Sequence, residues 1–251
     1  MKKILAGVVV LFLLSGAAVF AYDSDESGGT EVYFGFQFNI DLQDGNTTQI
    51  PSFNLGARGY FADVGPGMQL GYSVFANLGF ISEMDFGGLK ITSDMVNNLT
   101  NVGVLLAVSL RGDIANGLGF VADFGFAGNA DIGSWDVIQT WFPDSTIAGI
   151  TVPGTPQLIY NYQIMDFYFG LGLNAALQYR LPVGGGTSAL VFEAGANFAF
   201  CFFNEISLTG TERELNISGE EIRTASITLT APTRDAARMR IGPYILIGWR
   251  F

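Results

Sequence analysis

Apolar residues recur at every second position in eight stretches of this chain. In residues 32–42, every even position is apolar, from Val32 to Leu42, and every odd position is small or polar, from Tyr33 to Asp41. Successive side chains of a strand point to opposite faces, so this alternation predicts a strand with one wholly apolar face. The other stretches are residues 53–61, 68–80, 102–110, 118–126, 165–179, 190–202 and 241–251.

The length of these stretches favours a membrane barrel over a soluble sheet. Strands of soluble proteins average about 5–6 residues, whereas a strand that crosses a bilayer at a barrel tilt needs about 9–11. All eight stretches reach the longer range. Past the N-terminal segment, no apolar run of about 18 residues offers a helical span. The sequence therefore predicts an all-β fold, a transmembrane up-and-down antiparallel β-barrel of eight strands.

Two shorter segments leave the strand count open. Residues 206–208 and 227–229 also alternate, and we interpret them as a hairpin that extends the last two strands above the membrane. A barrel of ten strands is the alternative.

The connections between the stretches alternate in length. The links at residues 62–67, 112–117 and 182–186 are short, whereas those at about 82–101, 130–161 and 204–239 are long. Short periplasmic turns and long extracellular loops are typical of bacterial outer-membrane barrels. We therefore expect both ends of the mature chain in the periplasm and the three long loops outside the cell.

The N-terminus predicts export. Lys2 and Lys3 precede an apolar segment, residues 4–14, and Val19-Phe20-Ala21 is a plausible cleavage site. This is the pattern of a cleaved signal peptide, here residues 1–21, and it leaves residues 22–251 as the outer-membrane barrel. A retained helical anchor is the alternative.

The charged residues avoid the apolar faces. None of the eight apolar stripes carries Lys, Arg, Asp or Glu, and at the bilayer midplane an Arg or Lys there would cost about 2–4 kcal/mol. The charges fall on the opposite face, inside a barrel whose interior is just wide enough for side chains. We expect an arginine–carboxylate network in the lumen, because buried charges need partners. Its predicted members are Arg58, Arg111, Asp123, Asp166, Arg180, Glu193, Arg240 and Arg250.

The composition argues against several kinds of chemistry. The chain has no histidine, which removes the usual general base, and no cluster with metal-ligand spacing, so we expect no enzyme, metal or cofactor. A formal net charge of −11 argues against nucleic acid as a partner, because phosphate binding needs clustered Lys and Arg. The single Cys201 excludes an internal disulfide, and its inward position predicts a filler role.

Two of the long loops carry candidate binding residues. The loop at residues 130–161 is unusually apolar, and we expect it to fold over the barrel mouth as a lid, although it could instead meet lipid headgroups or bind an apolar ligand. Its candidate contact residues are Trp135, Ile138, Trp141 and Phe142. The loop at residues 204–239 is mixed in charge and net acidic, which fits a solvated hairpin or a contact with host proteins or divalent cations.

The C-terminal residues Gly248-Trp249-Arg250-Phe251 resemble the signature that the bacterial barrel-assembly machinery recognises. With the strand count and the loop asymmetry, the chain resembles the small outer-membrane barrels of the OmpA, OmpX and OmpW type. The resemblance implies outer-membrane lipid and the assembly machinery as partners, with Trp249 and Phe251 as the assembly signal. A simpler interpretation makes both residues interfacial girdle aromatics.

These observations predict a structural or surface-binding role that is carried by the extracellular loops, with a possible host or cell-surface ligand. The alternative is a narrow channel for small or hydrophobic solutes. Glycines on the inward faces either leave room for such a path or relieve crowding where the sheet curves. They are Gly35, Gly56, Gly71, Gly79, Gly103, Gly125, Gly170, Gly172 and Gly195.

Overall fold

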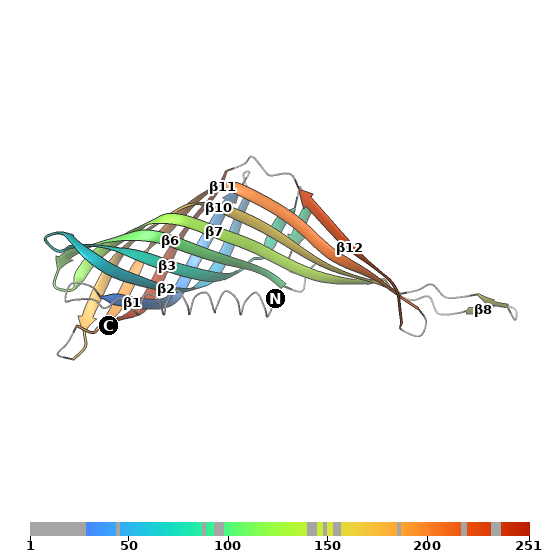
Figure 1. Ribbon diagram of the computed structural model, residues 1–251, viewed down its shortest axis with the longest axis horizontal. Coiled ribbons are helices and arrows are strands. Elements are labelled where there is room, and N and C mark those ends of the chain that lie inside the picture. Colours follow the sequence, from blue (N-terminus) through green and yellow to red (C-terminus); the bar gives the residue numbers. More distant parts are fainter. Residues whose placement is uncertain are drawn as a thin grey trace.

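The computed structural model describes residues 29–43, 46–86, 89–92, 98–139, 145–147, 150–152, 157–184, 187–216, 220–231 and 237–251 (Figure 1). The expected signal peptide, residues 1–21, lies outside them. Every regular element in these ranges is a strand. No helix in the same ranges is long and apolar enough to cross a membrane.

Nine strands of the described chain form one antiparallel sheet. They are β1 (Thr30–Gln43), β2 (Asn46–Gly65), β3 (Met68–Phe80), β6 (Asn98–Ala115), β7 (Leu118–Gln139), β10 (Gln157–Pro182), β11 (Ala189–Leu215), β12 (Glu221–Ala231) and β13 (Arg238–Arg250). The sheet order is β10-β7-β6-β3-β2-β1-β13-β11-β12, and pairing of β10 with β11 closes the ring.

The ring therefore contains eight of the nine strands of this sheet, which confirms the expected up-and-down barrel. Among these strands β12 pairs only with β11. Both β12 and β13 lie on the same side of β11, where β13 pairs with residues 189–201 and β12 with residues 206–215. This β11–β12 pair includes Leu208 opposite Leu229, so the two short alternating segments form a hairpin and not a ninth and tenth wall strand. Two small separate hairpins are β4 (Glu83–Phe86) with β5 (Leu89–Thr92) and β8 (Ser145–Ile147) with β9 (Ile150–Val152).

Tight turns join the strands at one end of the barrel, which we call the turn end. Asn116 and Gly117 connect β6 to β7 with φ angles of 42° and 84°. Positive φ values at both central residues are typical of a type I′ turn, which favours the sequence Asn-Gly. The twist of this turn matches that of the two strands it joins. The first residues of β1 also lie at this end, where Glu31 pairs in register with Arg250 of the last strand.

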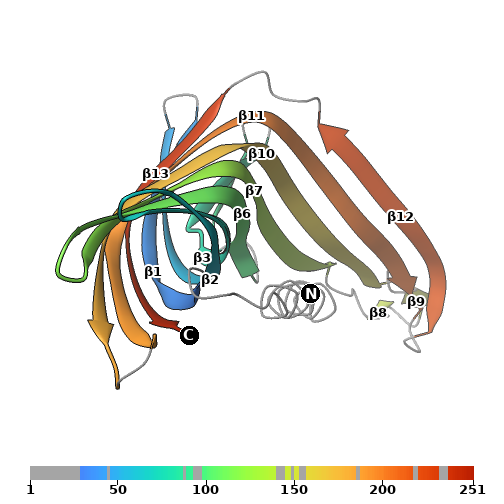
Figure 2. The ribbon, with the colours of Figure 1, turned by 60° about the vertical axis from the view of Figure 1, so that its left-hand side comes forward.

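At the opposite end, the ring strands β7, β10 and β11 continue past the ring and form a curved sheet with β12 (Figure 2). β7 and β10 remain paired as far as Gln139 and Leu158, well past the last partner that β6 offers to β7, at Ser134. We call this sheet the extension; it comprises residues 134–139, 157–163, 209–215 and 221–231. The expected bounds of the long loops are thereby corrected, because residues 130–139, 157–161, 204–215 and 221–231 are strand. In the first long loop, residues 98–101 belong to β6.

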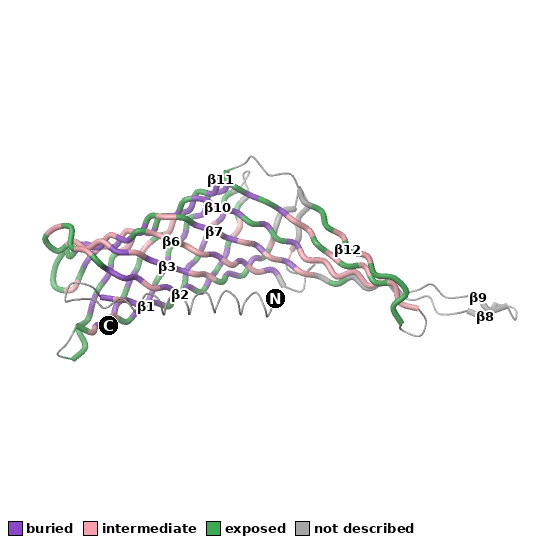
Figure 3. The backbone as a smooth tube through the Cα atoms, in the orientation of Figure 1, coloured by how far each residue is buried: buried purple, intermediate pink, exposed green. Residues whose placement is uncertain are grey.

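The barrel has its apolar side chains outside and its polar ones inside. Buried and less buried residues alternate along the strands (Figure 3). Phe34, Phe36 and Phe124 are about 60% exposed, whereas Arg58, Asp123 and Glu193 are buried. A soluble protein would bury the phenylalanines and expose the charges, so this inverted arrangement requires an apolar solvent around the wall.

Candidate functional site: the lumen and the extension

The half of the lumen near the turn end is built around one buried guanidinium. Arg58 Nε and Nη2 donate to Asp123 Oδ1 and Oδ2 at 3.0 and 2.7 Å, and Nη1 and Nη2 donate to Glu193 at 2.5 and 2.9 Å. The guanidinium carbon also lies 5.0 Å from the ring centre of Tyr33 and 4.8 Å from that of Phe75. One arginine of β2 thus ties together β7 and β11 across the barrel.

Neutral side chains complete this cluster, which we call the turn-end cluster. Ser109 Oγ donates to Asp123 at 2.7 Å, and the Tyr244 hydroxyl donates to Glu193 at 2.8 Å. Next to it Arg180 pairs with Glu31, and Gln178 Nε2 donates to the Tyr33 hydroxyl at 2.7 Å. A buried ion pair is stable only when its remaining lone pairs are also satisfied, and these donors meet that requirement.

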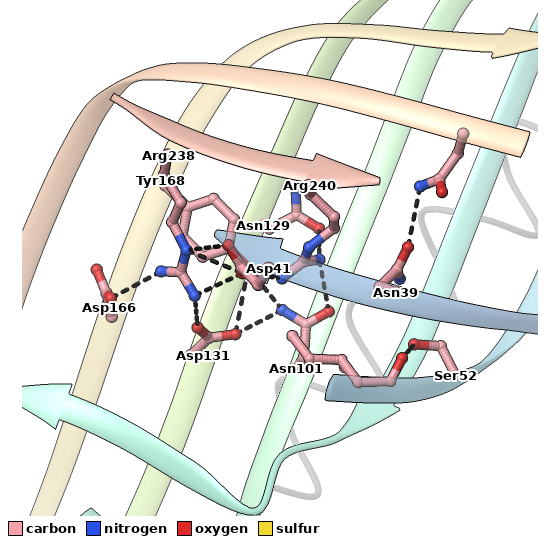
Figure 4. A network of polar contacts seen from close by, with 12 residues as sticks. Asn39, Asp41, Ser52, Asn101, Asn129, Asp131, Asp166, Tyr168, Arg238 and Arg240 are labelled. Atoms are coloured by element: carbon pink, nitrogen blue, oxygen red, sulfur yellow. Dashed lines mark hydrogen bonds and ion pairs between the residues drawn. The ribbon is translucent and has the colours of Figure 1, made fainter. Parts of the chain in front are cut away.

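A second cluster lies farther from the turn end, and its centre is Arg238 of β13 (Figure 4). Arg238 Nε donates to both oxygens of Asp41 at 2.9 Å, Nη1 donates to Asp166 at 2.9 Å, and Nη2 donates to Asp131 at 2.6 Å. Its guanidinium carbon lies 3.8 Å from the ring centre of Tyr168. This single residue therefore joins carboxylates from β1, β7 and β10.

Arg240, two residues farther along β13, completes this outer cluster. Its Nη2 donates to Asp41 at 2.9 Å, and its Nη1 donates to Asn129 at 2.8 Å and to Asn101 at 3.1 Å. The side chain is 2% exposed. Both clusters use arginine because its flat, branched donor set can satisfy two or three carboxylates at once.

The eight lumen residues expected from the sequence fall into separate groups. Arg58, Asp123 and Glu193 share the turn-end cluster, whereas Asp166 and Arg240 belong to the outer one. Arg180 pairs with Glu31 and Arg111 with Asp113. Arg250 lies with Arg111 and Arg180 around an opening of about 700 Å³ at the turn end.

Besides Asp113, sequence reasoning missed four charged members of these groups, namely Glu31, Asp41, Asp131 and Arg238. All four stand at inward positions that continue the same two-residue period. Arg238, for instance, precedes Arg240 by two residues, and Asp131 follows Asp123 by eight. Extending each alternation by a few residues would have found Glu31, Asp131 and Arg238, whereas Asp41 already lies at an inward position of the stretch 32–42 and was not assigned to the network.

An aliphatic cluster lies beyond the outer cluster. Ile50, Ile81, Leu99, Ile164 and Ile206 are at most 6% exposed and contact one another, with Leu208 packed against them. Leu99 is the next inward residue after Asn101, and Ile164 the next after Asp166, toward the extension. These five residues, which we call the seal, form an apolar layer across the mouth of the barrel.

The inward glycines make room for neighbouring side chains. A Cβ atom on Gly56 would lie 2.0 Å from the ring of Phe75, and one on Gly103 would lie 2.2 Å from Asn129 Oδ1 and 2.5 Å from Asn77 Nδ2. The space beside both glycines is therefore filled by rings and amides from adjacent strands. These two positions fit the relief of crowding better than an open path.

The apolar face of the sheet changes sides in the extension. Within the barrel, the outward residues of β10 are apolar, such as Met165 and Phe167. In the extension the outward Asn161 and Gln163 are polar, and Tyr160 and Tyr162 on the inner face stack at 5.9 Å with an interplanar angle of 4°. A Cβ on Gly210 would meet the Tyr162 ring at 2.6 Å, so this ring packs on the backbone of β11.

Two of the four candidate lid residues lie in a strand of the described chain. Trp135 and Ile138 belong to β7, paired in register with Tyr162 and Ile159 of β10, and Trp141 and Phe142 lie outside the described residues. The β8–β9 hairpin lies at the far tip of the extension, away from the barrel mouth (Figure 1). The backbone of Trp135 and Ile138 thus continues the sheet past the ring, and a lid or ligand contact by the four candidate side chains stays a prediction.

Three other candidate residues have clear positions. Cys201 is buried on the inward face of β11. Trp249 and Phe251 are 36% and 57% exposed near the turn end. Within the described ranges, no group of three or more His, Cys, Asp or Glu side chains could hold a metal ion.

A closed ring of long strands, charged inside and apolar outside, satisfies every backbone group of the wall without water and presents hydrocarbon to its surroundings. The chain is an outer-membrane β-barrel.

Comparison with known proteins supports no closer relationship. No protein-family model matches the chain, and no curated protein is similar to it in sequence. Solved structures with a similar arrangement of strands include Ail, the attachment invasion locus protein of Yersinia pestis, at 11% identity and a TM-score of 0.42, covering 89% of this chain and 99% of that one. Neisserial surface protein A matches at 8% identity and 0.43, covering 88% and 95%. A major outer membrane protein of Thermus thermophilus matches at 16% and 0.39, covering 90% and 100%.

Proposed function

We propose that this protein is a closed, non-enzymatic outer-membrane barrel that binds partners at the cell surface through its extracellular extension. The observation that carries the proposal is the extension itself. Its four strands form a sheet beyond the seal with an aromatic inner face, and among the described strands its outer edges have no hydrogen-bonded neighbour.

Two features of the extension support a binding role. β12 has a hydrogen-bonded partner on one side only among the described strands, so the other edge of residues 221–231 presents free backbone N–H and C=O groups. Residues 224–231 of this strand carry no charge and no proline, the devices by which proteins usually block such edges. Tyr160 and Tyr162 add a flat apolar surface with polar hydroxyl groups, a composition common at protein interfaces.

The lumen supports the complementary claim that the barrel does not conduct. An ion would have to pass the two arginine–carboxylate clusters and then the seal, whose five aliphatic side chains offer no polar contact. Hydrophobic constrictions stop conduction by excluding water. The barrel is thus a rigid support in which ion pairs fill the lumen.

A planar lipid bilayer experiment tests the closed lumen. Purified full-length protein should leave the bilayer silent, whereas the double variant Ile164→Ser/Ile206→Ser, which places hydroxyl groups in the seal, should at most raise a small leak. Discrete openings by the native protein would favour the narrow channel instead.

Surface binding is tested with the protein in lipid nanodiscs against a panel of purified cell-surface and extracellular-matrix proteins. The matched variant keeps the ring and shortens the extension by joining residue 133 to 164 and residue 208 to 237 through short Gly-Ser linkers. Binding by the full-length barrel that the shortened barrel loses supports the proposal. Equal binding by both, or by neither, contradicts it.

A further inference from the structure

A small cavity lies in the middle of the lumen, between the two ion-pair clusters. Its volume is about 40 Å³. Arg240 lines it from the outer cluster, while Asn174 and Tyr244, which donate to Asp123 and Glu193, line it from the turn-end cluster. The cavity therefore adjoins both charged groups and is separated from the cell exterior by the seal.

Several polar atoms around this cavity have no hydrogen-bond partner among the described residues. They are Asn77 Oδ1 and Asn197 Oδ1, which accept hydrogen bonds, and Arg240 Nε, which donates. All three residues line the cavity, and each of these atoms is buried. Leaving buried donors and acceptors unpaired is costly, and native proteins pair the great majority of them.

The set of unpaired atoms selects a chemical class of ligand. A bare cation would satisfy the two amide oxygens but would meet the positive Arg240. An anion would satisfy Arg240 but would meet the amide oxygens. A neutral molecule that both donates and accepts hydrogen bonds satisfies all three atoms, and the volume has room for roughly one to three water molecules.

We propose that this cavity binds structural water, which bridges Arg240 to Asn77 and Asn197 and so joins the two ion-pair clusters. Buried waters of this kind make about three hydrogen bonds each and act as part of the protein. The amides around the cavity already form a chain: Asn54 Nδ2 donates to Gln37 at 2.6 Å, Gln37 Nε2 donates to Asn39 at 2.5 Å, and Asn197 Nδ2 donates to Asn39 at 3.0 Å. The water completes this middle layer, which goes beyond the surface-binding role proposed above and does not depend on it.

Asn77→Leu gives opposite results for a wet and a dry cavity. Leucine is close to asparagine in size but offers no acceptor. In a wet cavity the substitution takes a partner from the water, so the ratio of folded to unfolded protein should fall by about five- to tenfold. In a dry cavity it removes an unsatisfied carbonyl and adds apolar contact, so the ratio should rise. The measurement is reversible urea unfolding in lipid vesicles, with Asn161→Leu in the extension as the control for the same change at an unburied amide.

Water contact is measured directly in the native protein, which keeps the proposal testable even when the variant does not fold. In NMR spectra of the full-length barrel in micelles, the side-chain amides of Asn77 and Asn197 should show nuclear Overhauser peaks at the water frequency, with the sign of long-lived water. Absence of these peaks at both amides, or a stabilised Asn77→Leu variant, would overturn the proposal.

Discussion

Replacing Arg58 by alanine should destabilise the barrel more than any substitution of an exposed charge. The guanidinium makes four hydrogen bonds of 2.5–3.0 Å to Asp123 and Glu193, and all three side chains are 0% exposed in their ion pairs. Its removal leaves two carboxylates in the lumen without their cation.

The size of the loss follows from what remains around the carboxylates. Ser109 and Asn174 still donate to Asp123, and Tyr244 still donates to Glu193, so neither group is left without a hydrogen bond. Breaking a buried ion pair from one side typically costs about 3–5 kcal/mol, and we expect Arg58→Ala to lie in that range. Since whole domains are stable by only about 5–15 kcal/mol, the change should be plain in any unfolding curve.

The assay is equilibrium urea unfolding in lipid vesicles, followed by the gel mobility of folded and unfolded protein. Arg213→Ala, in the exposed part of β11, is the matched control and should change stability by at most about 1 kcal/mol. A second variant, Arg58→Met combined with Asp123→Asn and Glu193→Gln, removes the charges together and should recover much of the loss. The reasoning is refuted when Arg58→Ala unfolds within about 1 kcal/mol of the native protein.

Three further predictions concern the wall, a turn and the buried thiol. Phe124→Arg, at a residue 58% exposed to the membrane, should cost about 2–4 kcal/mol in the same unfolding assay, while Thr228→Arg in the extension should be nearly neutral. Gly117→Ala should lower stability by about 1 kcal/mol or more. Gly117 has a φ of 84°, and a Cβ atom there would lie 2.5 Å from the carbonyl oxygen of Arg180. An unchanged midpoint of urea unfolding would contradict the assigned turn. Cys201 should resist a maleimide reagent in the folded barrel and react fully after unfolding, as mass spectrometry would report.

The sequence was most informative where each strand stays in one environment. β3 runs from Met68 to Phe80, the limits that its alternation predicts, because all of its outward residues face hydrocarbon. The sequence also predicts the closed ring, because each of the eight membrane-crossing strands needs a hydrogen-bonded neighbour on both sides in lipid.

Prediction failed where a strand passes from lipid into water. Within β10 the period of two continues without a break, but the apolar residues move to the inner face between Met165 and Ile164. A search that follows only the odd-numbered apolar residues of this strand ends at Met165, so the extension was interpreted as a loop. In β11 a bulge opposite Phe169 and Gly170 adds one residue, which leaves Phe202 and Phe203 both exposed and shifts the parity again.

Arg58 and its partners illustrate a second limit. The alternation shows which charges point inward, but it carries no information on which strand lies opposite. Arg58 and Glu193 are 135 residues apart in sequence, and their contact follows from the height of each residue along a tilted strand. The pairing therefore depends on the register of the whole ring.

The exchange of faces between Met165 and Ile164 also determines how deeply the protein sits in its membrane. Sliding the barrel outward by two residues along β10 would expose Met165 and Phe167 to water, and sliding it inward would bring Gln163 and Asn161 into hydrocarbon. Either displacement raises the free energy of the barrel wall itself, independently of any partner or loop. The height of the extension above the bilayer is thus determined by the position in β10 at which the apolar residues change from the outer to the inner face.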